Sequence, residues 1–168
     1  MAEADLALLM QANKLLRMDS VPAPFQTFHV HPQLLESGKT STRLLRSEVL
    51  SAGVQVVAQG GETNLHKHPA DEEVWYILAG KPRFYTVGDE VVATLGAHEA
   101  LYVPRDTPYW FESVSDAGEN LVILRIGATL PDLPRQRIDM GDRIYAVRGE
   151  PGGIDREVTV RPGAFFGR

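Results

Sequence analysis

Two of the five histidines stand one residue apart, just before a cluster of acidic residues. The stretch is GGETNLHKHPADEEVWYILAG, residues 60–80, and it contains His66, His68 and Glu73. Imidazole nitrogens and a carboxylate oxygen suit Fe(II), Mn, Ni or Zn, and two histidines with one carboxylate leave coordination positions open. The residue types therefore suggest a site for one divalent transition metal, with Fe(II) favoured.

Such a site requires local structure that brings the three side chains together. In a β-strand His66 and His68 project to the same face, because alternate side chains share a face. Pro69 begins a short segment that can turn the chain, and Glu73 then opens an apolar run. If that run faces a barrel interior, the imidazoles and the carboxylate converge in an apolar pocket. The alternative is a solvated histidine pair beside a solvated acidic turn, which needs no metal.

The rest of the chain predicts the elements around this stretch. From about residue 40, short runs of Val, Ile, Leu and aromatic residues are separated by Gly, Pro and Asp, which is typical of an antiparallel sandwich or barrel. Residues 5–18 have the apolar spacing of an amphipathic helix, which the prolines at 22 and 24 end. We therefore expect an all-β protein with an N-terminal helix and Pro-rich arm (1–40), a barrel (41–128) and a C-terminal extension (129–168) that packs on the barrel or on a partner subunit.

Composition excludes several classes of function. The formal net charge is −5 and the 17 Lys and Arg residues are scattered, so no nucleic-acid partner is expected. The chain has no cysteine, which excludes disulfides, thiolate metal sites and thiol nucleophiles. The apolar piece at 6–10 is short and follows acidic residues, unlike a signal peptide, and no run approaches membrane-spanning length. We expect a cytoplasmic protein with no membrane partner.

Residues 60–80 resemble the first conserved motif of the cupin superfamily, G-x5-H-x-H-x4-E-x6-G. Gly60, His66, His68, Glu73 and Gly80 occupy its five fixed positions. The resemblance covers roughly residues 45–127 and implies a jelly-roll β-barrel with a metal at its centre. It implies that the two histidines and Glu73 are the metal ligands. The neighbouring Glu72 is a weaker candidate, since its side chain has the opposite parity.

The second cupin motif, G-x5-P-x-G-x2-H-x3-N, is degenerate. Pro104 matches, but His98 and Asp106 replace the two glycines, Tyr109 replaces the ligand histidine and Ser113 replaces the asparagine. Three roles remain open for Tyr109: a phenolate ligand, a catalytic acid, base or hydrogen-bond donor that stands off the metal, or a filler of a pocket that has lost its metal. We favour the second role, because two histidines and one carboxylate can hold a metal without a fourth ligand.

Other residues have expected places in this barrel. Trp75 and Phe111 share the inward parity of Tyr109, so we expect them to line a substrate pocket. His98 replaces a turn glycine and is expected in a surface turn with positive φ, which histidine tolerates better than most residues. A second His-x-His pair, His29 and His31, lacks the motif glycines and is interpreted as structural.

The resemblance implies a metal-dependent enzyme that acts on a small molecule. We expect dioxygenase-like chemistry on a small aromatic or enolisable substrate, with Tyr109 as the catalytic residue. Isomerase, cyclase and lyase chemistry are the alternatives within the same fold, and a non-catalytic ligand-binding barrel with a degenerate metal site is the alternative outside it. A homodimer is expected, since proteins of this resemblance commonly pair through a swapped N-terminal strand.

Overall fold

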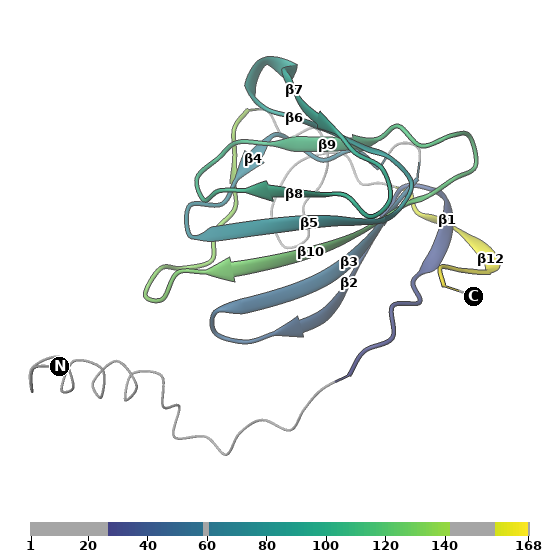
Figure 1. The fold of residues 1–168 in the computed structure, drawn as a ribbon, viewed down its shortest axis with the longest axis horizontal. Coiled ribbons are helices and arrows are strands. Elements are labelled where there is room, and N and C mark those ends of the chain that lie inside the picture. Colours follow the sequence, from purple (N-terminus) through teal and green to yellow (C-terminus); the bar gives the residue numbers. More distant parts are fainter. Residues whose placement is uncertain (1–26, 59–60, 142–156, 168) are drawn as a thin grey trace, which may run out of the picture.

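The computed structural model describes residues 27–58, 61–141 and 157–167. The expected helix at 5–18 lies outside these residues. The described residues form strands and one short 3-10 helix, η1 (Val87–Asp89), as Figure 1 shows. The strands are β1 (Gln33–Ser37), β2 (Lys39–Arg46), β3 (Leu50–Val57), β4 (His66–Lys67), β5 (Asp71–Ala79), β6 (Pro82–Tyr85), β7 (Val91–Thr94), β8 (Ala100–Val103), β9 (Trp110–Ser113), β10 (Leu121–Thr129), β11 (Ile138–Asp139) and β12 (Thr159–Phe165). Within the described ranges no helix has the length and apolar character needed to cross a membrane.

Two antiparallel sheets face each other. The larger has the strand order β2-β3-β10-β5-β8, and the smaller has the order β7-β6-β9. The short strands β4 and β11 pair beside them. In Figure 1 the five-stranded sheet forms the lower layer and the three-stranded sheet the upper one. The expected all-β jelly-roll architecture is confirmed.

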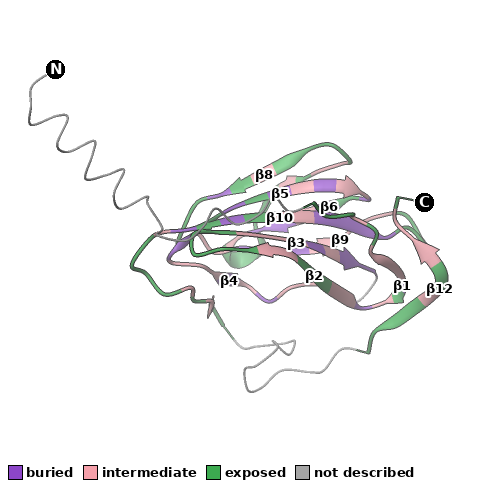
Figure 2. Cartoon of the chain, turned by 90° about the horizontal axis from the view of Figure 1, so that it is seen from below, coloured by how far each residue is buried: buried purple, intermediate pink, exposed green. Residues whose placement is uncertain are grey.

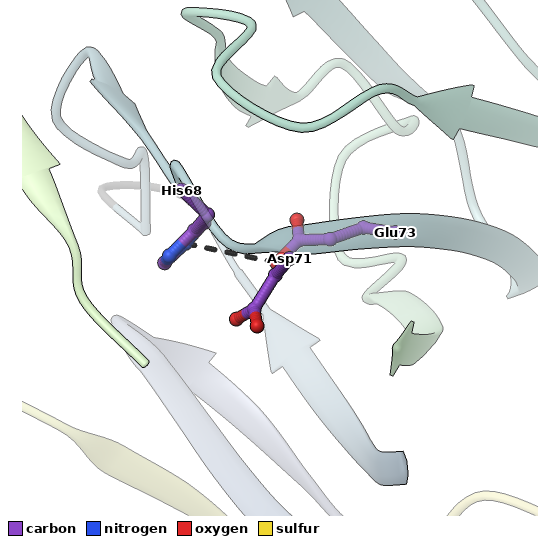
Figure 3. A group of neighbouring side chains, drawn as sticks. All are labelled: His68, Asp71 and Glu73. Atoms are coloured by element: carbon purple, nitrogen blue, oxygen red, sulfur yellow. Dashed lines mark ion pairs between the residues drawn. The ribbon is translucent and has the colours of Figure 1, made fainter. Parts of the chain in front are cut away.

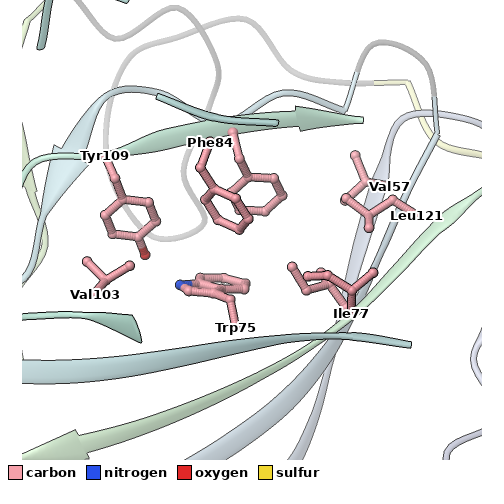
Figure 4. Packing of buried hydrophobic residues seen from close by; sticks show 9 residues of the cluster. Val57, Trp75, Ile77, Phe84, Val103, Tyr109 and Leu121 are labelled. Carbon is pink, nitrogen blue, oxygen red and sulfur yellow. The ribbon is translucent and has the colours of Figure 1, made fainter. Parts of the chain in front are cut away.

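Strand β5 shows why this sequence packs between the sheets. Its odd-numbered residues from 71 to 77 are buried, while the even-numbered ones are exposed or half-buried. This period of two places one face of the strand in the interior. Trp75 packs there against Phe111, with ring centroids 5.2 Å apart, and Phe111 packs equally close to Phe84 (Figure 4). These aromatic side chains form the inner cluster together with Val57, Ile77, Val103, Tyr109, Leu121 and Ile123.

A second apolar cluster covers the back of the five-stranded sheet. Strand β1 pairs with β12, and the two lie side by side at one end of the barrel (Figure 1). Leu35 of β1 is fully buried against Val54, Val56 and Val122. The Asn120 amide fixes this strand, because its Oδ1 accepts a hydrogen bond from the Leu35 backbone nitrogen at 2.7 Å and its Nδ2 donates to the Leu35 carbonyl at 3.0 Å. Figure 2 shows that β12 and β8 carry exposed residues, whereas β10 in the middle of the larger sheet carries many buried ones.

Among the described residues of the two sequence motifs, three have positive φ. Gly80 has φ +79, and a Cβ there would lie 2.7 Å from Leu121 Cα, so only glycine fits. His98 has φ 71 and is exposed, which confirms the surface turn expected from the sequence. Asp106 has φ 59. Both replaced glycines of the second motif therefore keep the left-handed backbone that a glycine would supply.

Candidate metal centre

Backbone pairing brings the two motifs together. His66 and Tyr109 form a β-bridge, in which each backbone nitrogen donates to the carbonyl of the other, at 3.1 Å and 2.9 Å. Their side chains lie on the same side, with ring centroids 4.6 Å apart. The first motif thus lies against the second at Tyr109, the residue that replaces the ligand histidine of the second motif.

Both imidazoles are held by backbone carbonyls. The Nδ1 atom of His66 lies 2.7 Å from the Asn64 carbonyl oxygen, and that of His68 lies 3.0 Å from the Gln136 carbonyl oxygen. A carbonyl only accepts hydrogen bonds, so each Nδ1 is a donor and each Nε2 is the ring nitrogen left to face a metal, as in histidines that bind metals. Burial, together with Arg137 and His68, lowers the pKa of His66 well below its usual value, so its imidazole is neutral.

Glu73 is the centre of the buried polar network. Its side chain is 1% exposed, and its Oε1 accepts hydrogen bonds from Nη2 and Nε of Arg125, the latter at 2.7 Å. Oε2 accepts from the hydroxyl of Tyr109 and from Nε1 of Trp75 at 3.2 Å. The Nε2 of His68 lies 3.6 Å from Oε1. An inward carboxylate needs partners, and Glu73 has them on both oxygens.

A second carboxylate, Asp71, lies beside this network. Ligand atoms of His68, Asp71 and Glu73 all lie within 4.8 Å of one another (Figure 3). Asp71 also accepts a hydrogen bond from Thr129 at 2.6 Å and lies 3.5 Å from Arg125 Nη2. Of the three expected ligands the structure thus brings His68 and Glu73 together, whereas His66 lies outside the group and packs on Tyr109.

Two residues of this network, Asp71 and Arg125, were not predicted from the sequence, although each leaves a signal there. Asp71 has the same parity as Glu73 in the same strand, so it shares the inward face. Arg125 is the single charged residue in the apolar run NLVILRIG, residues 120–127. A cation in a buried strand implies a buried anion as its partner.

Tyr109 has the geometry of a hydrogen-bond donor. The residue is buried, and its hydroxyl donates to Glu73. Burial and the negative charge of Glu73 raise the pKa of Tyr109 well above its usual value, so the phenol keeps its proton. Figure 4 shows its hydroxyl at the same end of the inner cluster as the indole nitrogen of Trp75, which donates to the same carboxylate oxygen.

A cavity of about 280 Å³ opens beside these groups. His66, His68 and Tyr109 line it, and so do Trp75 and Phe111, the two residues expected in a pocket wall. Glu72, the weaker ligand candidate, does not line the cavity and is exposed on the other face of β5. There, desolvation first and the charge of Glu72 second raise the pKa of Tyr102. The second histidine pair lies elsewhere, where the rings of His29 and His31 stack 5.9 Å apart and His31 Nδ1 contacts the Phe166 carbonyl.

The donor set fits a divalent transition metal. Two imidazoles, each with its Nδ1 held by a backbone carbonyl, border one pocket with a buried carboxylate 3.6 Å from Nε2 of the second of them. Nitrogen and carboxylate oxygen ligands of this kind suit Fe(II), Mn, Ni or Zn. Arg125 competes for the same carboxylate, so metal binding and the ion pair must share Glu73.

Comparisons with known proteins agree with this architecture. Residues 53–125 match the family model described as a cupin domain. The chain is 26% identical over 92 residues to the uncharacterized protein MJ1618 of Methanocaldococcus jannaschii, an alignment that spans 52% of this chain and 72% of that protein.

Two solved structures show the same fold. One is an uncharacterized conserved protein with a double-stranded β-helix domain from Klebsiella pneumoniae, with a TM-score of 0.58 and 14% identity over 71% of this chain and 95% of that chain. The other is the DMSP lyase DddQ of Ruegeria pomeroyi, with a TM-score of 0.50 and 23% identity over 61% of this chain and 51% of that chain.

Proposed function

We propose, from the match of residues 53–125 to the cupin domain, that the chain is a metal-dependent enzyme of the cupin superfamily that catalyses proton transfer on a small organic substrate. The reaction class is that of isomerases, cyclases and lyases. The observation that carries this choice is the protonated hydroxyl of Tyr109, held by Glu73 at the wall of the cavity.

His68, Asp71 and Glu73 are the residues that would hold the metal, and His66 lies beside them on the cavity wall. When bound there, a divalent metal acts as a Lewis acid that polarises a substrate carbonyl. The chain supplies the remaining requirements. The carbonyls of Asn64 and Gln136 orient the imidazoles, and the aromatic wall of Trp75 and Phe111 excludes water from the reacting end of the cavity.

Tyr109 supplies a hydrogen bond where negative charge develops. Its raised pKa keeps the O–H group intact, and Glu73 orients it. The Nε2 of His66, which lines the same cavity beside Tyr109 and has its Nδ1 hydrogen-bonded to the Asn64 carbonyl, takes the proton lost next to a substrate carbonyl. The carbonyl oxygen becomes an oxyanion, and the Tyr109 hydroxyl turns from Glu73 to donate its hydrogen bond to that oxygen. Dioxygenase-like chemistry, the class expected from the sequence, has no comparable need for such a donor. This difference favours proton transfer.

Elemental analysis tests the metal requirement. The purified protein, after loading with Fe(II), Mn(II) or Zn(II) and desalting, is expected to hold about one metal per chain, and His68→Ala is expected to lose it. Lys67→Ala is the matched control, since Lys67 lies between the two histidines and pairs with Asp106 at 2.7 Å. Absence of metal from the wild-type protein after loading would support the non-catalytic ligand-binding barrel instead.

Exchange of substrate protons with D2O tests the reaction class. We expect the metal-loaded protein to exchange the α-protons of some members of a panel of small ketones, keto esters and keto acids, measured by proton NMR. Tyr109→Phe is expected to retain its metal and lose exchange. Oxygen consumption with these compounds, without proton exchange, would overturn the proposal in favour of a dioxygenase.

A further inference from the structure

The cavity has a cationic wall in an acidic protein. Lys39, Arg43, Arg125 and Arg137 all line it, although the whole chain has a formal net charge of −5. No Asp or Glu of the described ranges belongs to that lining. Arg125 pairs with Glu73, and Arg137 pairs with Asp139 at 2.9 Å. Lys39 and Arg43 both lie on β2, at the end of the cavity formed by that strand.

Arg43 lines the cavity from β2 and is exposed. It stands opposite Gly53 on β3, Gly53 stands opposite Arg125 on β10, and Arg125 stands opposite Trp75 on β5. Neighbouring strands are about 4.8 Å apart, so the two arginine backbones lie roughly 10 Å from each other. Gly53 has no side chain to fill the space between them, and it lines the cavity. Within the part of the chain that the structure describes, the guanidinium of Arg43 has no ion-pair or hydrogen-bond partner.

Two further groups, Gln55 and Lys39, border the end of the cavity that β2 forms. Gln55, two residues along β3 from Gly53, lines the cavity, and its Oε1 is buried with no hydrogen-bond partner in the described structure. Buried polar atoms nearly always have a partner, so this oxygen indicates a donor supplied by something else. Lys39 Nζ lies 4.9 Å from the ring centre of Phe111, which places its charge over the aromatic wall.

We propose that this end of the cavity binds the carboxylate of the substrate, and that the substrate is a small hydroxy- or keto-carboxylate. Arg43 binds the carboxylate, Lys39 adds charge, and the Gln55 side chain accepts a hydrogen bond from a neighbouring hydroxyl or enol. The acid is then held from the β2 side, with the rest of the molecule directed toward Tyr109. A cavity of about 280 Å³ admits a molecule of a few carbon atoms. This inference rests on the proposed function, whose reaction needs such a carbonyl compound.

Calorimetric titration with lactate and with its uncharged counterpart lactamide tests the assignment. Because hydroxy acids also bind metals, the titrations are made on chelator-treated protein and repeated on the metal-loaded form. We expect lactate to bind at least about 10-fold more tightly than lactamide, since a hydrogen bond to a charged group contributes that much. Arg43→Gln is expected to lower the affinity for lactate by at least about 10-fold and to leave the affinity for lactamide unchanged.

Two further variants sharpen the result. Arg46→Gln is the matched control, because Arg46 lies on the same strand, is exposed and does not line the cavity. It should bind lactate like the wild type. Gln55→Leu should lower the affinity for lactate more than the affinity for acetate, because acetate lacks the hydroxyl that Gln55 would bind.

The inference is overturned if the wild-type protein binds no lactate, if lactamide binds as tightly, or if Arg43→Gln binds lactate unchanged. Its failure is distinct from that of the proposed function. Lactate binding that depends on Arg43, in a protein with no metal or exchange activity, would remove the proposed function and keep the carboxylate site. If neutral ketones and keto acids exchanged their protons equally fast, the proposed function would stand and the carboxylate site would be refuted.

Discussion

Replacing Arg125 with methionine removes the cation that pairs with the buried carboxylate of Glu73. Removing one partner of a buried ion pair costs about 3–5 kcal/mol. The Arg125 side chain is 23% exposed, and Glu73 keeps its hydrogen bonds from Tyr109 and Trp75, so we expect the lower end, about 3 kcal/mol. For a chain of this size that corresponds to a fall in Tm of roughly 6–12 °C. On chelator-treated protein followed by circular dichroism, urea unfolding measures the change in free energy and thermal unfolding measures the change in Tm.

Metal loading should reduce this cost. A divalent cation on Glu73 replaces the positive charge that the substitution removes, so the unfolding midpoint should rise more on loading Arg125→Met than on loading the wild type. The double variant with Glu73→Gln should lose less stability than the sum of the two single variants, because the two residues interact directly.

Arg46→Met is the control and should change stability by less than about 0.5 kcal/mol, as expected for an exposed residue. Two results would refute the reasoning. One is a cost below about 1 kcal/mol for Arg125→Met in the chelated protein. The other is an equal effect of metal loading on wild type and variant, which would mean that the metal and Arg125 do not share the carboxylate.

Three further outcomes are expected. Tyr109→Phe deletes a hydrogen bond to a buried carboxylate and should lower the free energy of unfolding by about 1.5–3 kcal/mol while metal content stays unchanged; loss of metal would contradict a role away from the metal. The lowered pKa of His66 means that the unfolded chain binds more protons than the folded chain near pH 6, so the metal-free protein should lose stability as pH falls below about 6.5. In urea titrations from pH 8 to 5.5 the loss should be smaller in His66→Gln, and equal losses would contradict it. Light scattering should give about twice the 18.5 kDa chain mass for the expected homodimer, and a monomer mass would contradict it.

The sequence was informative wherever one strand or one turn decided the outcome. The alternation in β5 indicated the inward side of Glu73 and Trp75, because a period of two is a local property. The turn at His98 followed from a motif position that requires positive φ.

Contacts between strands were harder to predict, because register depends on the whole sheet. Arg125 and Glu73 are 52 residues apart. Gly127 stands opposite Glu73 and leaves room for the guanidinium, since a Cβ at that glycine would lie 3.0 Å from Arg125 Nη2. His66 was expected to join the acids and instead packs on Tyr109, because its backbone bridges to that residue. Trp75, Tyr109 and Phe111 line one cavity as the sequence predicted, whereas the charged residues Asp71 and Arg125 beside it were missed.

The pairing of β1 with β12 has a consequence for synthesis on the ribosome. Leu35 pairs with Val160, so the strand that emerges early waits for more than a hundred residues before its partner exists. During that interval Leu35 can pack on the back of the five-stranded sheet, but β1 has no backbone partner on its β12 side. Contacts of such long range slow folding and leave apolar surface open to other chains. A nascent chain stalled before residue 159 should therefore bind chaperones that a chain extended past residue 165 no longer needs.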